Sequence, residues 1–310
     1  MAGKPPLIVL LGPTAVGKTA LGIELALAIG GEIISADSRQ IYRFMDIATA
    51  KPTPEQRERV PHHLLDVVDP DENLSLAQFQ RLAHAAIQAV LGRNRIPVVV
   101  GGTGQYLTAL VEGWQIPEVP PNQRLRAELE AFAAAQGTLA LHQRLAQADP
   151  EAARAIDHRN VRRVVRALEV CLETGQPISR LQTKAPPPFR IVQHGLTLER
   201  QALYRRADDR LADMLRRGLL DEIRQLLARG YSPRLPAMSG LGYRQIIPHI
   251  LHAKPLDDAL ADARHATHAF IRRQYTWFRG HDTGILWHNM DDLVVSRFIE
   301  AVERRLKEQV

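Results

Sequence analysis

The chain has 310 residues, so a large domain with an inserted or appended piece is expected. Apolar residues make up 45% and charged residues 24%, which excludes a disordered chain, and the single cysteine, Cys171, excludes an intramolecular disulfide framework. The net charge of +6 fits a partner with a phosphate backbone but does not require one. No apolar run has membrane-spanning length and no signal segment is visible, so we expect a cytoplasmic protein without a membrane partner.

The N-terminal third predicts strands that alternate with helices. Residues 7–11 and 32–35 are short apolar runs of strand length, and residues 18–29 between them have a helical pattern. A helix capped by Ser75 is predicted to run to about residue 91, and a further strand covers residues 97–100. This alternation is typical of a parallel sheet with helices on both faces.

The composition changes at residues 117–121, where prolines interrupt the pattern, and again at the Pro186–Pro188 run. Between these boundaries every strong pattern is helical, and Cys171 lies in one such helix as a buried thiol. The predicted fold is therefore an α/β P-loop core with a parallel sheet and an all-helical insertion. The predicted parts are residues 1–117 and 189–310 for the core and residues 118–188 for the insertion.

The last third predicts a strand at residues 191–198 and two long helices. The first helix covers residues 204–229 and ends at Gly230, and the second covers residues 257–278 and is dense in Arg and His. A glycine-containing loop at residues 238–244 separates them.

A complete phosphate-binding motif lies between the first strand and the first helix. Backbone N–H groups of such a loop point at phosphate oxygens, Lys18 adds a cation, and the Thr19 hydroxyl is placed to coordinate Mg²⁺. The strand–loop–helix context disfavours a chance glycine turn. The residues predicted to bind a diphosphate here are Gly12, Pro13, Thr14, Ala15, Val16, Gly17, Lys18 and Thr19.

The acidic residue that ordinarily helps a P-loop nucleoside triphosphatase to hold Mg²⁺ has no clear counterpart. The strand at residues 97–100 ends in Gly101, and Asp66 follows only two clean apolar residues. We therefore interpret the bound phosphate as a leaving group rather than a transferred group.

Asp37 and Thr103 follow predicted strands, so we expect them to share one sheet edge with the P-loop. Asp37 is equally compatible with a general base and with a cap for the next turn. Thr103 fits a hydrogen bond to phosphate or metal-bound water, and it also fits a turn residue among glycines. His62 and His63 lack neighbouring residues with metal-ligand spacing, so we interpret them as structural.

Arginines are concentrated on three predicted helices. Arg206 and Arg210 are four residues apart and share one helix face, which suits either a pyrophosphate clamp or a solvated face paired with aspartates. The last cluster is interleaved with aromatic residues that suit RNA binding, a buried helix face, or both. The clusters are Arg162, Arg163 and Arg166; Arg205, Arg206 and Arg210; and Arg272, Arg273 and Arg279.

In their order along the chain, these and other short motifs make the sequence resemble the tRNA dimethylallyltransferases. One departure is Ala48, where the family pattern has Gly. The motifs are Gly-Pro-Thr-Ala-Val-Gly-Lys-Thr at 12–19, Ile-Ser-Ala-Asp-Ser-Arg-Gln-Ile-Tyr at 34–42, Met-Asp-Ile-Ala-Thr-Ala-Lys-Pro-Thr at 45–53, Pro-His-His-Leu-Leu-Asp at 61–66, Val-Gly-Gly-Thr-Gly-Gln-Tyr at 100–106, Arg-Ala-Leu-Glu-Val at 166–170, Gly-Leu-Gly-Tyr-Arg-Gln at 240–245 and Arg-Arg-Gln-Tyr-Thr-Trp-Phe-Arg at 272–279.

The resemblance implies transfer of a dimethylallyl group from dimethylallyl diphosphate to N6 of the adenine 3′ of the anticodon. Asp37 matches the family's base, and Thr103 matches a position near both reactants. Lys18, the loop amides and Mg²⁺ at Thr19 would neutralise the leaving pyrophosphate, with Arg206 or Arg210. A tRNA anticodon stem-loop is the implied partner, with no obligate protein partner, and nothing demands more than a monomer.

The resemblance also implies which residues contact tRNA, namely residues in the second, fifth, seventh and eighth motifs and on the insertion. They are Asp37, Ser38, Arg39, Gln40, Thr103, Arg124, Arg162, Arg163, Arg166, Gly240, Leu241, Gly242, Tyr243, Arg244, Gln245, Arg272, Arg273, Gln274, Trp277 and Arg279.

Three other functions remain open at this point. A P-loop small-molecule kinase would use ATP and need no tRNA, but the missing acidic strand end disfavours it. Prenyl transfer to a free adenine nucleotide would not require three arginine clusters. An RNA-binding protein without catalysis would leave the complete P-loop and Asp37 unexplained.

Overall fold

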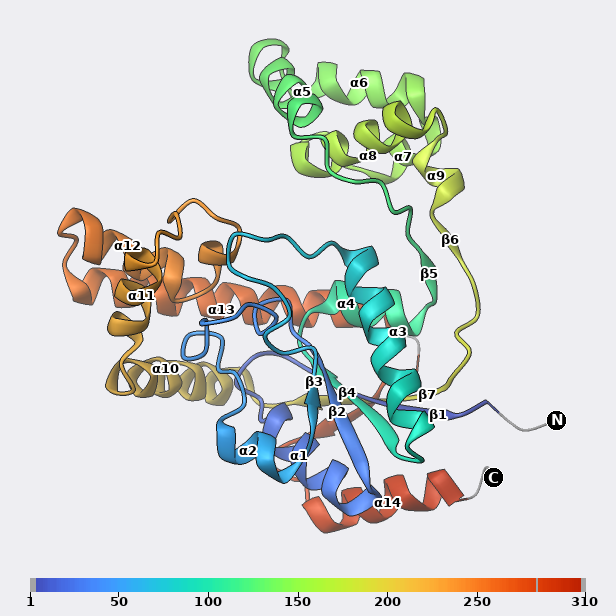
Figure 1. The fold of residues 1–310 in the computed structure, drawn as a ribbon, viewed down its shortest axis with the longest axis vertical. Helices are drawn as coiled ribbons and strands as arrows, with labels where there is room; N and C mark the ends of the chain where they lie inside the picture. The colour runs from blue at the N-terminus through green and yellow to red at the C-terminus, as the bar shows by residue number, and fades with distance from the viewer. Residues whose placement is uncertain (1–3, 283, 308–310) are drawn as a thin grey trace. The chain divides into compact units, whose positions relative to one another are not determined.

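The computed structural model describes residues 4–282 and 284–307, which form two compact units (Figure 1). The core unit contains Phe79–Val111 with the segments that end at Ser75 and begin at Pro187. The helical unit contains Glu112–Pro186 together with Leu76–Gln78, which is the first turn of α3 (Leu76–Gly92). In the described part of the chain, no helix combines the length and apolar character needed to cross a membrane.

The core unit is built on a parallel sheet of six strands in the order β3-β2-β4-β1-β7-β8, which confirms the predicted fold class. The apolar runs of β1, β2 and β4 are buried along almost their whole length, because helices cover both faces of the sheet. The strands are β1 Pro6–Leu11, β2 Gly31–Ala36, β3 His62–His63, β4 Ile96–Gly101, β7 Arg190–Thr197 and β8 Leu286–Asn289.

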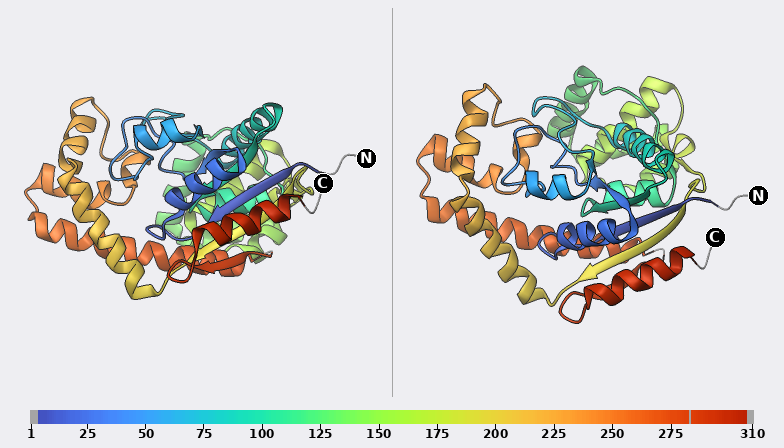
Figure 2. Two further views of the ribbon diagram at one scale, coloured as in Figure 1. Left: turned by 90° about the horizontal axis from the view of Figure 1, so that it is seen from below. Right: turned by 60° about the horizontal axis from the view of Figure 1, so that its bottom comes forward.

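Helices lie on both faces of this sheet, with α1 and α14 on one face and α3 and α4 on the other (Figure 2). Alternate residues of the central strands, such as Ile8 and Val98, join α1 and α14 in one apolar cluster. On the other face the rings of Phe79 and Tyr106 stack at 3.7 Å between centroids. The helices are α1 Lys18–Ile29, α2 Pro54–Arg59, α3 Leu76–Gly92, α4 Gly104–Val111, α10 Arg200–Arg216, α11 Leu219–Ala228, α12 Tyr243–His252, α13 Leu256–Gly280 and α14 Val295–Lys307.

The single helix predicted over residues 204–229 is wrong, because the chain forms α10 and α11 instead. Gly218 separates them with a φ of +94°, a left-handed conformation that ends one helix and starts the next. The predicted loop at 238–244 is also shorter than expected. A short 3₁₀ turn covers Ala237–Ser239, and α12 begins at Tyr243.

The helical unit has its own apolar core, centred on residues such as Leu141, Leu145 and Val164. Cys171 is buried in α8, as predicted. The unit is not entirely helical, because β5 Trp114–Gln115 and β6 Thr183–Lys184 pair in an antiparallel ladder where the chain enters and leaves it. Its helices are α5 Gln123–Gln136, α6 Thr138–Ala148, α7 Pro150–Ala155, α8 Val161–Thr174 and α9 Ile178–Leu181.

Candidate active site

The phosphate-binding loop connects β1 to the N-terminus of α1. Gly12 and Gly17 have φ values of +150° and +105°, and a side chain at Gly12 would lie 2.6 Å from the carbonyl oxygen of Leu196. Ala15 also has a positive φ, of 64°. The loop thus places its backbone at the positive end of the α1 dipole, where an anion is stabilised.

Lys18 is the first residue of α1, and its ammonium Nζ donates to the carbonyl oxygen of Pro13 at 2.7 Å. Desolvation lowers the pKa of Lys18 to about 7, with Asp37 acting to raise it and Arg210 acting to lower it. The ammonium therefore lies close to one carboxylate and one guanidinium, and a bound phosphate would stabilise its charged form.

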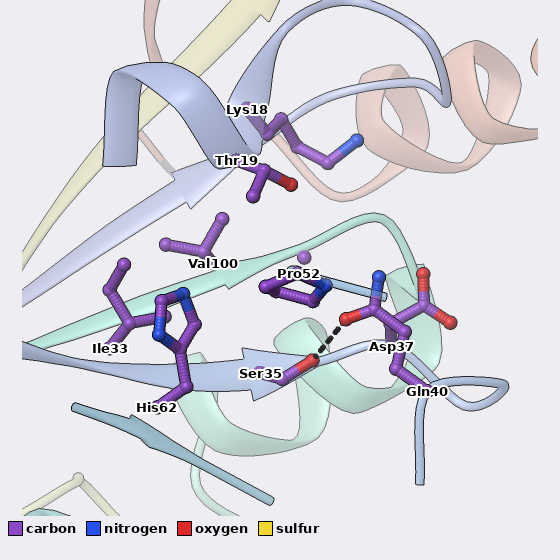
Figure 3. A pocket seen from close by; sticks show the side chains of 10 residues that line it. Lys18, Thr19, Ile33, Ser35, Asp37, Gln40, Pro52, His62 and Val100 are labelled. Atoms are coloured by element: carbon purple, nitrogen blue, oxygen red, sulfur yellow. Dashed lines mark hydrogen bonds between the residues drawn. The ribbon is translucent and has the colours of Figure 1, made fainter. Parts of the chain in front are cut away.

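A pocket opens beside Lys18 at the carboxyl edge of the central strands (Figure 3). Leu11 and Ala36 are both in register with Gly101, so the ends of β1, β2 and β4 meet there. Lys18 and Thr19 project from α1, and Asp37 and Gln40 lie across the pocket from them (Figure 3). The lining residues are Lys18, Thr19, Ile33, Ser35, Asp37, Gln40, Pro52, His62, Val100 and Gly101.

Asp37 directly follows β2, and its Oδ1 accepts the backbone N–H of Arg39 at 2.8 Å. This bond is the local turn that the alternative interpretation of Asp37 anticipated. The same carboxylate also interacts electrostatically with Lys18 and Arg210. Asp37 therefore has both a turn contact and a place among the cations of the pocket.

Thr103 fastens the turn after β4 to the segment that carries Asp37. Its Oγ1 accepts the backbone N–H of Ser38 at 2.9 Å, and its own N–H donates to the carbonyl oxygen of Ala36 at 3.3 Å. The structure thus brings Thr103, Asp37 and the P-loop to one edge of the sheet.

Of the two arginines predicted to bind diphosphate, only Arg210 interacts with the pocket's charged groups. Burial lowers its pKa, Asp37 acts to raise it, and the neighbouring Arg217 acts to lower it. Arg206 lies one turn earlier on α10 and is exposed. Arg217 was missed from the sequence, although its position two helical turns after Arg210 was a usable signal.

Several residues expected to contact tRNA form hydrogen bonds within the core unit instead. Arg39 donates through Nη1 to the carbonyl oxygen of Pro236 at 2.8 Å. Gln40 is 9% exposed, and its Oε1 accepts from the Ser35 hydroxyl at 3.0 Å. Its Nε2 donates to the carbonyl oxygen of Ala50 at 3.1 Å.

The segment 240–245 is also largely buried. Tyr243 is 1% exposed, and its hydroxyl donates to the Glu222 carboxylate at 2.6 Å. Gly240 and Gly242 are buried, Leu241 and Gln245 are half-buried, and Arg244 is exposed. Gln245 accepts the N–H of Gly242 through Oε1 at 3.1 Å.

Glu222 and Lys51 are structural residues of this region that the sequence did not single out. Glu222 accepts the backbone N–H groups of Asp46 and Ile47 at 2.8 and 2.7 Å. The buried Lys51 Nζ donates to the carboxylate of Asp66 at 2.7 Å. Asp66 also accepts from Arg57 at 2.9 Å, so this carboxylate stabilises the loop and does not serve as a metal-binding strand end.

Each histidine of β3 has a short contact within the core unit, and His62 also lines the pocket. His63 Nε2 lies 2.7 Å from Glu32 Oε2, and His62 Nδ1 lies 2.7 Å from the carbonyl oxygen of Val60. Among residues 4–282 and 284–307, no group of three or more His, Cys, Asp or Glu is arranged to hold a metal ion.

The arginine-rich segment at the end of α13 has two different faces. Arg272, Arg273 and Arg279 are exposed, and Arg272 donates to the Tyr204 hydroxyl at 3.1 Å. Gln274 is buried, and the indole Nε1 of Trp277 donates to Thr108 Oγ1 at 3.0 Å. The side chains of Arg272, Arg273 and Arg279 are therefore available to a macromolecule without rearrangement, whereas that of Gln274 is not.

In the helical unit, Arg162 and Arg163 are exposed on α8. Arg124 is exposed and paired with Glu128 at 2.9 Å. Arg166 donates to Glu169, a fully buried carboxylate that also accepts from Arg126. Arg166 therefore neutralises a buried charge within this unit.

Together, the parallel sheet and the loop at the N-terminus of α1 define an α/β P-loop protein. The chain belongs to the IPP transferase family, whose model matches residues 40–281, and an isopentenyl transferase model matches residues 5–67. A tRNA dimethylallyltransferase of Roseiflexus sp. (strain RS-1) is 56% identical over 274 residues, which is 88% of this chain and 90% of that protein.

Two solved structures resemble this fold over 99% of the chain. A tRNA isopentenylpyrophosphate transferase of Bacillus halodurans has 37% sequence identity and a TM-score of 0.73, with 98% of its chain covered. A eukaryotic dimethylallyltransferase, described in snapshots of its action on tRNA, has 27% identity and a TM-score of 0.84, with 80% of its chain covered.

Proposed function

We propose that this enzyme transfers a dimethylallyl group from dimethylallyl diphosphate to N6 of the adenine 3′ of the anticodon in tRNA, with release of pyrophosphate. The observation that carries the proposal is that Asp37 lies across one pocket from Lys18 and Thr19 of the P-loop. A carboxylate base and a diphosphate site are the two elements that this reaction requires. The relatives named as tRNA dimethylallyltransferases support the same acceptor.

The N6 amino group is a poor nucleophile, because its lone pair is delocalised into the purine ring. As the new C–N bond forms, Asp37 accepts the N6 proton. The C–O bond to the diphosphate breaks, and negative charge grows on the leaving group. Lys18, Arg210 and the N–H groups at the start of α1 stabilise that charge.

The residues present fit Mg²⁺ bound mainly by the substrate. Mg²⁺ usually keeps several waters and takes only one or two protein ligands besides phosphate oxygens. Thr19 lies in the pocket next to Lys18, so its hydroxyl would hold the ion against the diphosphate. Bound Mg²⁺ would supply further stabilisation of the leaving group's charge.

We assign tRNA binding to five of the exposed arginines, which are Arg162 and Arg163 on α8 and Arg272, Arg273 and Arg279 on α13. Guanidinium groups bind phosphate oxygens in bidentate geometry. In this assignment residues 1–117 and 189–310 form the catalytic core, and residues 118–188 form an insertion that clasps the anticodon stem-loop. We also propose that the enzyme acts on tRNA in the cytoplasm.

One experiment separates this function from its alternatives. The protein is incubated with radiolabelled dimethylallyl diphosphate, Mg²⁺ and either tRNA or free adenine nucleotides. We expect label on tRNA, and nuclease digestion should locate it at the adenine next to the anticodon. Label on free nucleotide but not on tRNA would refute the proposal. Phosphate transfer from ATP, without prenyl transfer, would instead support a kinase.

A further inference from the structure

Gln274 lies in the middle of the arginine-rich segment of α13, but its side chain is only 6% exposed. Its Oε1 accepts the backbone N–H of Thr14 in the phosphate loop at 2.9 Å. Its Nε2 donates to the carbonyl oxygen of Gly102, in the turn after β4, at 2.8 Å. One amide group thus connects three segments that are far apart in the sequence.

The Thr14 N–H belongs to the same peptide unit as the Pro13 carbonyl, which accepts Lys18 Nζ at 2.7 Å. A trans peptide is planar, and its N–H and C=O point in opposite directions. When Gln274 holds the N–H, the carbonyl is therefore aimed at the Lys18 ammonium. Rotation of this peptide would remove the oxygen that positions Lys18.

The turn after β4 is shaped for this contact. A side chain at Gly102 would place its Cβ 2.7 Å from Gln274 Nε2 and 3.4 Å from Lys18 Nζ. The Gln274 amide and the Lys18 ammonium therefore both approach the same glycine. At Gly104, two residues further, a Cβ would lie 2.2 Å from the ring of Trp277, so α13 packs directly on this turn.

We infer that Gln274 is a positioning residue for the diphosphate site, which sets the orientation of the Pro13–Thr14 peptide and through it the place of the Lys18 ammonium. This inference rests on the proposed function for the identity of the substrate. It also removes Gln274 from the residues that contact tRNA, because both ends of its amide are already bonded in the core unit.

Two substitutions test the inference. Gln274→Met keeps the length of the side chain but removes both hydrogen bonds. Gln274→Glu keeps an acceptor for Thr14 N–H, and when ionised it places a second oxygen against the Gly102 carbonyl. The matched control is Gln88→Met on the exposed face of α3, which makes the same chemical change away from the site.

The first measurement is the affinity for inorganic pyrophosphate with Mg²⁺, by calorimetry. We expect Gln274→Met to bind about tenfold more weakly, because a buried N–H and a buried C=O lose their partners. Affinity for fluorescently labelled tRNA should stay unchanged, and so should both affinities of Gln88→Met. In the transfer assay KM for dimethylallyl diphosphate should rise while KM for tRNA does not. Unchanged pyrophosphate affinity, or a loss confined to tRNA, would overturn the inference.

The second measurement is the pH dependence of Gln274→Glu. A carboxylic acid in this buried place has a raised pKa, and once protonated it regains the donor to the Gly102 carbonyl. Relative to the wild type at each pH, pyrophosphate affinity of Gln274→Glu should recover as the pH falls from about 8 to about 6. Gln274→Met should show no such recovery. Absence of any recovery in Gln274→Glu would mean that the amide only fills space, and this comparison with the wild type does not require Gln274→Met to fold.

These outcomes are independent of the proposed function. If the wild type places no label on tRNA, the proposed acceptor is wrong, and pyrophosphate binding by the variants still tests the role of Gln274. If the wild type modifies tRNA and the variants bind pyrophosphate normally, only the positioning role is wrong.

Discussion

Two segments of eight residues, 12–19 and 272–279, look equally informative in the sequence but behave differently in the structure. In the first, consecutive backbone groups form one loop at the N-terminus of α1. In the second, a helix distributes consecutive residues to opposite faces, so Arg273 is exposed while Gln274 is buried. When the chemistry of a motif lies in its backbone groups, the whole motif can be assigned one role from the sequence. When a motif lies on a helix, its exposed and buried residues must be assigned separate roles.

The largest expected effect separates the two roles of Asp37. Asp37→Asn keeps an oxygen for the Arg39 N–H but loses the base, so turnover should fall by about 10³-fold with tRNA affinity retained. Single-turnover kinetics and a tRNA binding assay measure the two effects. Asp157 accepts the N–H of Arg159 in the same kind of turn at 2.8 Å, so Asp157→Asn is the matched control and should keep full activity. Normal turnover in Asp37→Asn would contradict the role of Asp37 as a base, and its hydrogen bond to the Arg39 N–H would then be its only assigned role.

The next effect concerns stability. Glu222 accepts two short backbone N–H bonds and the Tyr243 hydroxyl, so Glu222→Ala should lower the free energy of unfolding by about 3 kcal/mol. Tyr243→Phe removes one of these bonds and should cost about 1 kcal/mol. Urea denaturation measures both values. If Tyr243→Phe instead weakened tRNA binding at unchanged stability, segment 240–245 would belong to the RNA surface.

A third prediction divides Arg210 from Arg206, which the sequence treated as equivalent. Arg210→Ala should raise KM for dimethylallyl diphosphate about tenfold, because a charged donor to the leaving group is lost. Arg206→Ala, one turn away and exposed, is the control and should have little effect. Equal losses from the two variants would show that the whole face of α10 binds the substrate.

The sequence predicted a parallel sheet, α1 and the edge at which Asp37 and Thr103 lie, because the alternation of strands and helices and the position of each loop after its strand are local features. It did not predict that Gly218 interrupts the helix after Arg216, since a glycine pattern alone does not reveal a positive φ. It also missed Glu222 and Lys51. Their partners lie on other segments, and pairing between distant segments appears only when the chain is folded.

The fourth prediction concerns the pH dependence of pyrophosphate binding by the P-loop, residues 12–19. In the free enzyme the pKa of Lys18 is about 7, so the ammonium is charged below that pH and largely neutral above it. Bound pyrophosphate raises this pKa, and binding should therefore take up a proton at pH values above 7 and weaken by up to about tenfold per pH unit. Calorimetry in buffers of different ionisation enthalpy measures the proton uptake. Lys18→Met supplies the baseline for titration of pyrophosphate itself, and an identical uptake in that variant would contradict the assignment to Lys18.

The smallest expected effect concerns the exposed arginines of segment 272–279. Arg273→Ala removes a solvent-exposed cation from α13, so tRNA affinity should fall several-fold and the salt slope of binding should decrease by about 1. Affinity for pyrophosphate should not change, in contrast to substitutions of the adjacent Gln274. An unchanged salt slope would mean that Arg273 contacts no phosphate. Exposure on α13 would then not identify the residues that contact tRNA, and the division of this motif by helix face would fail.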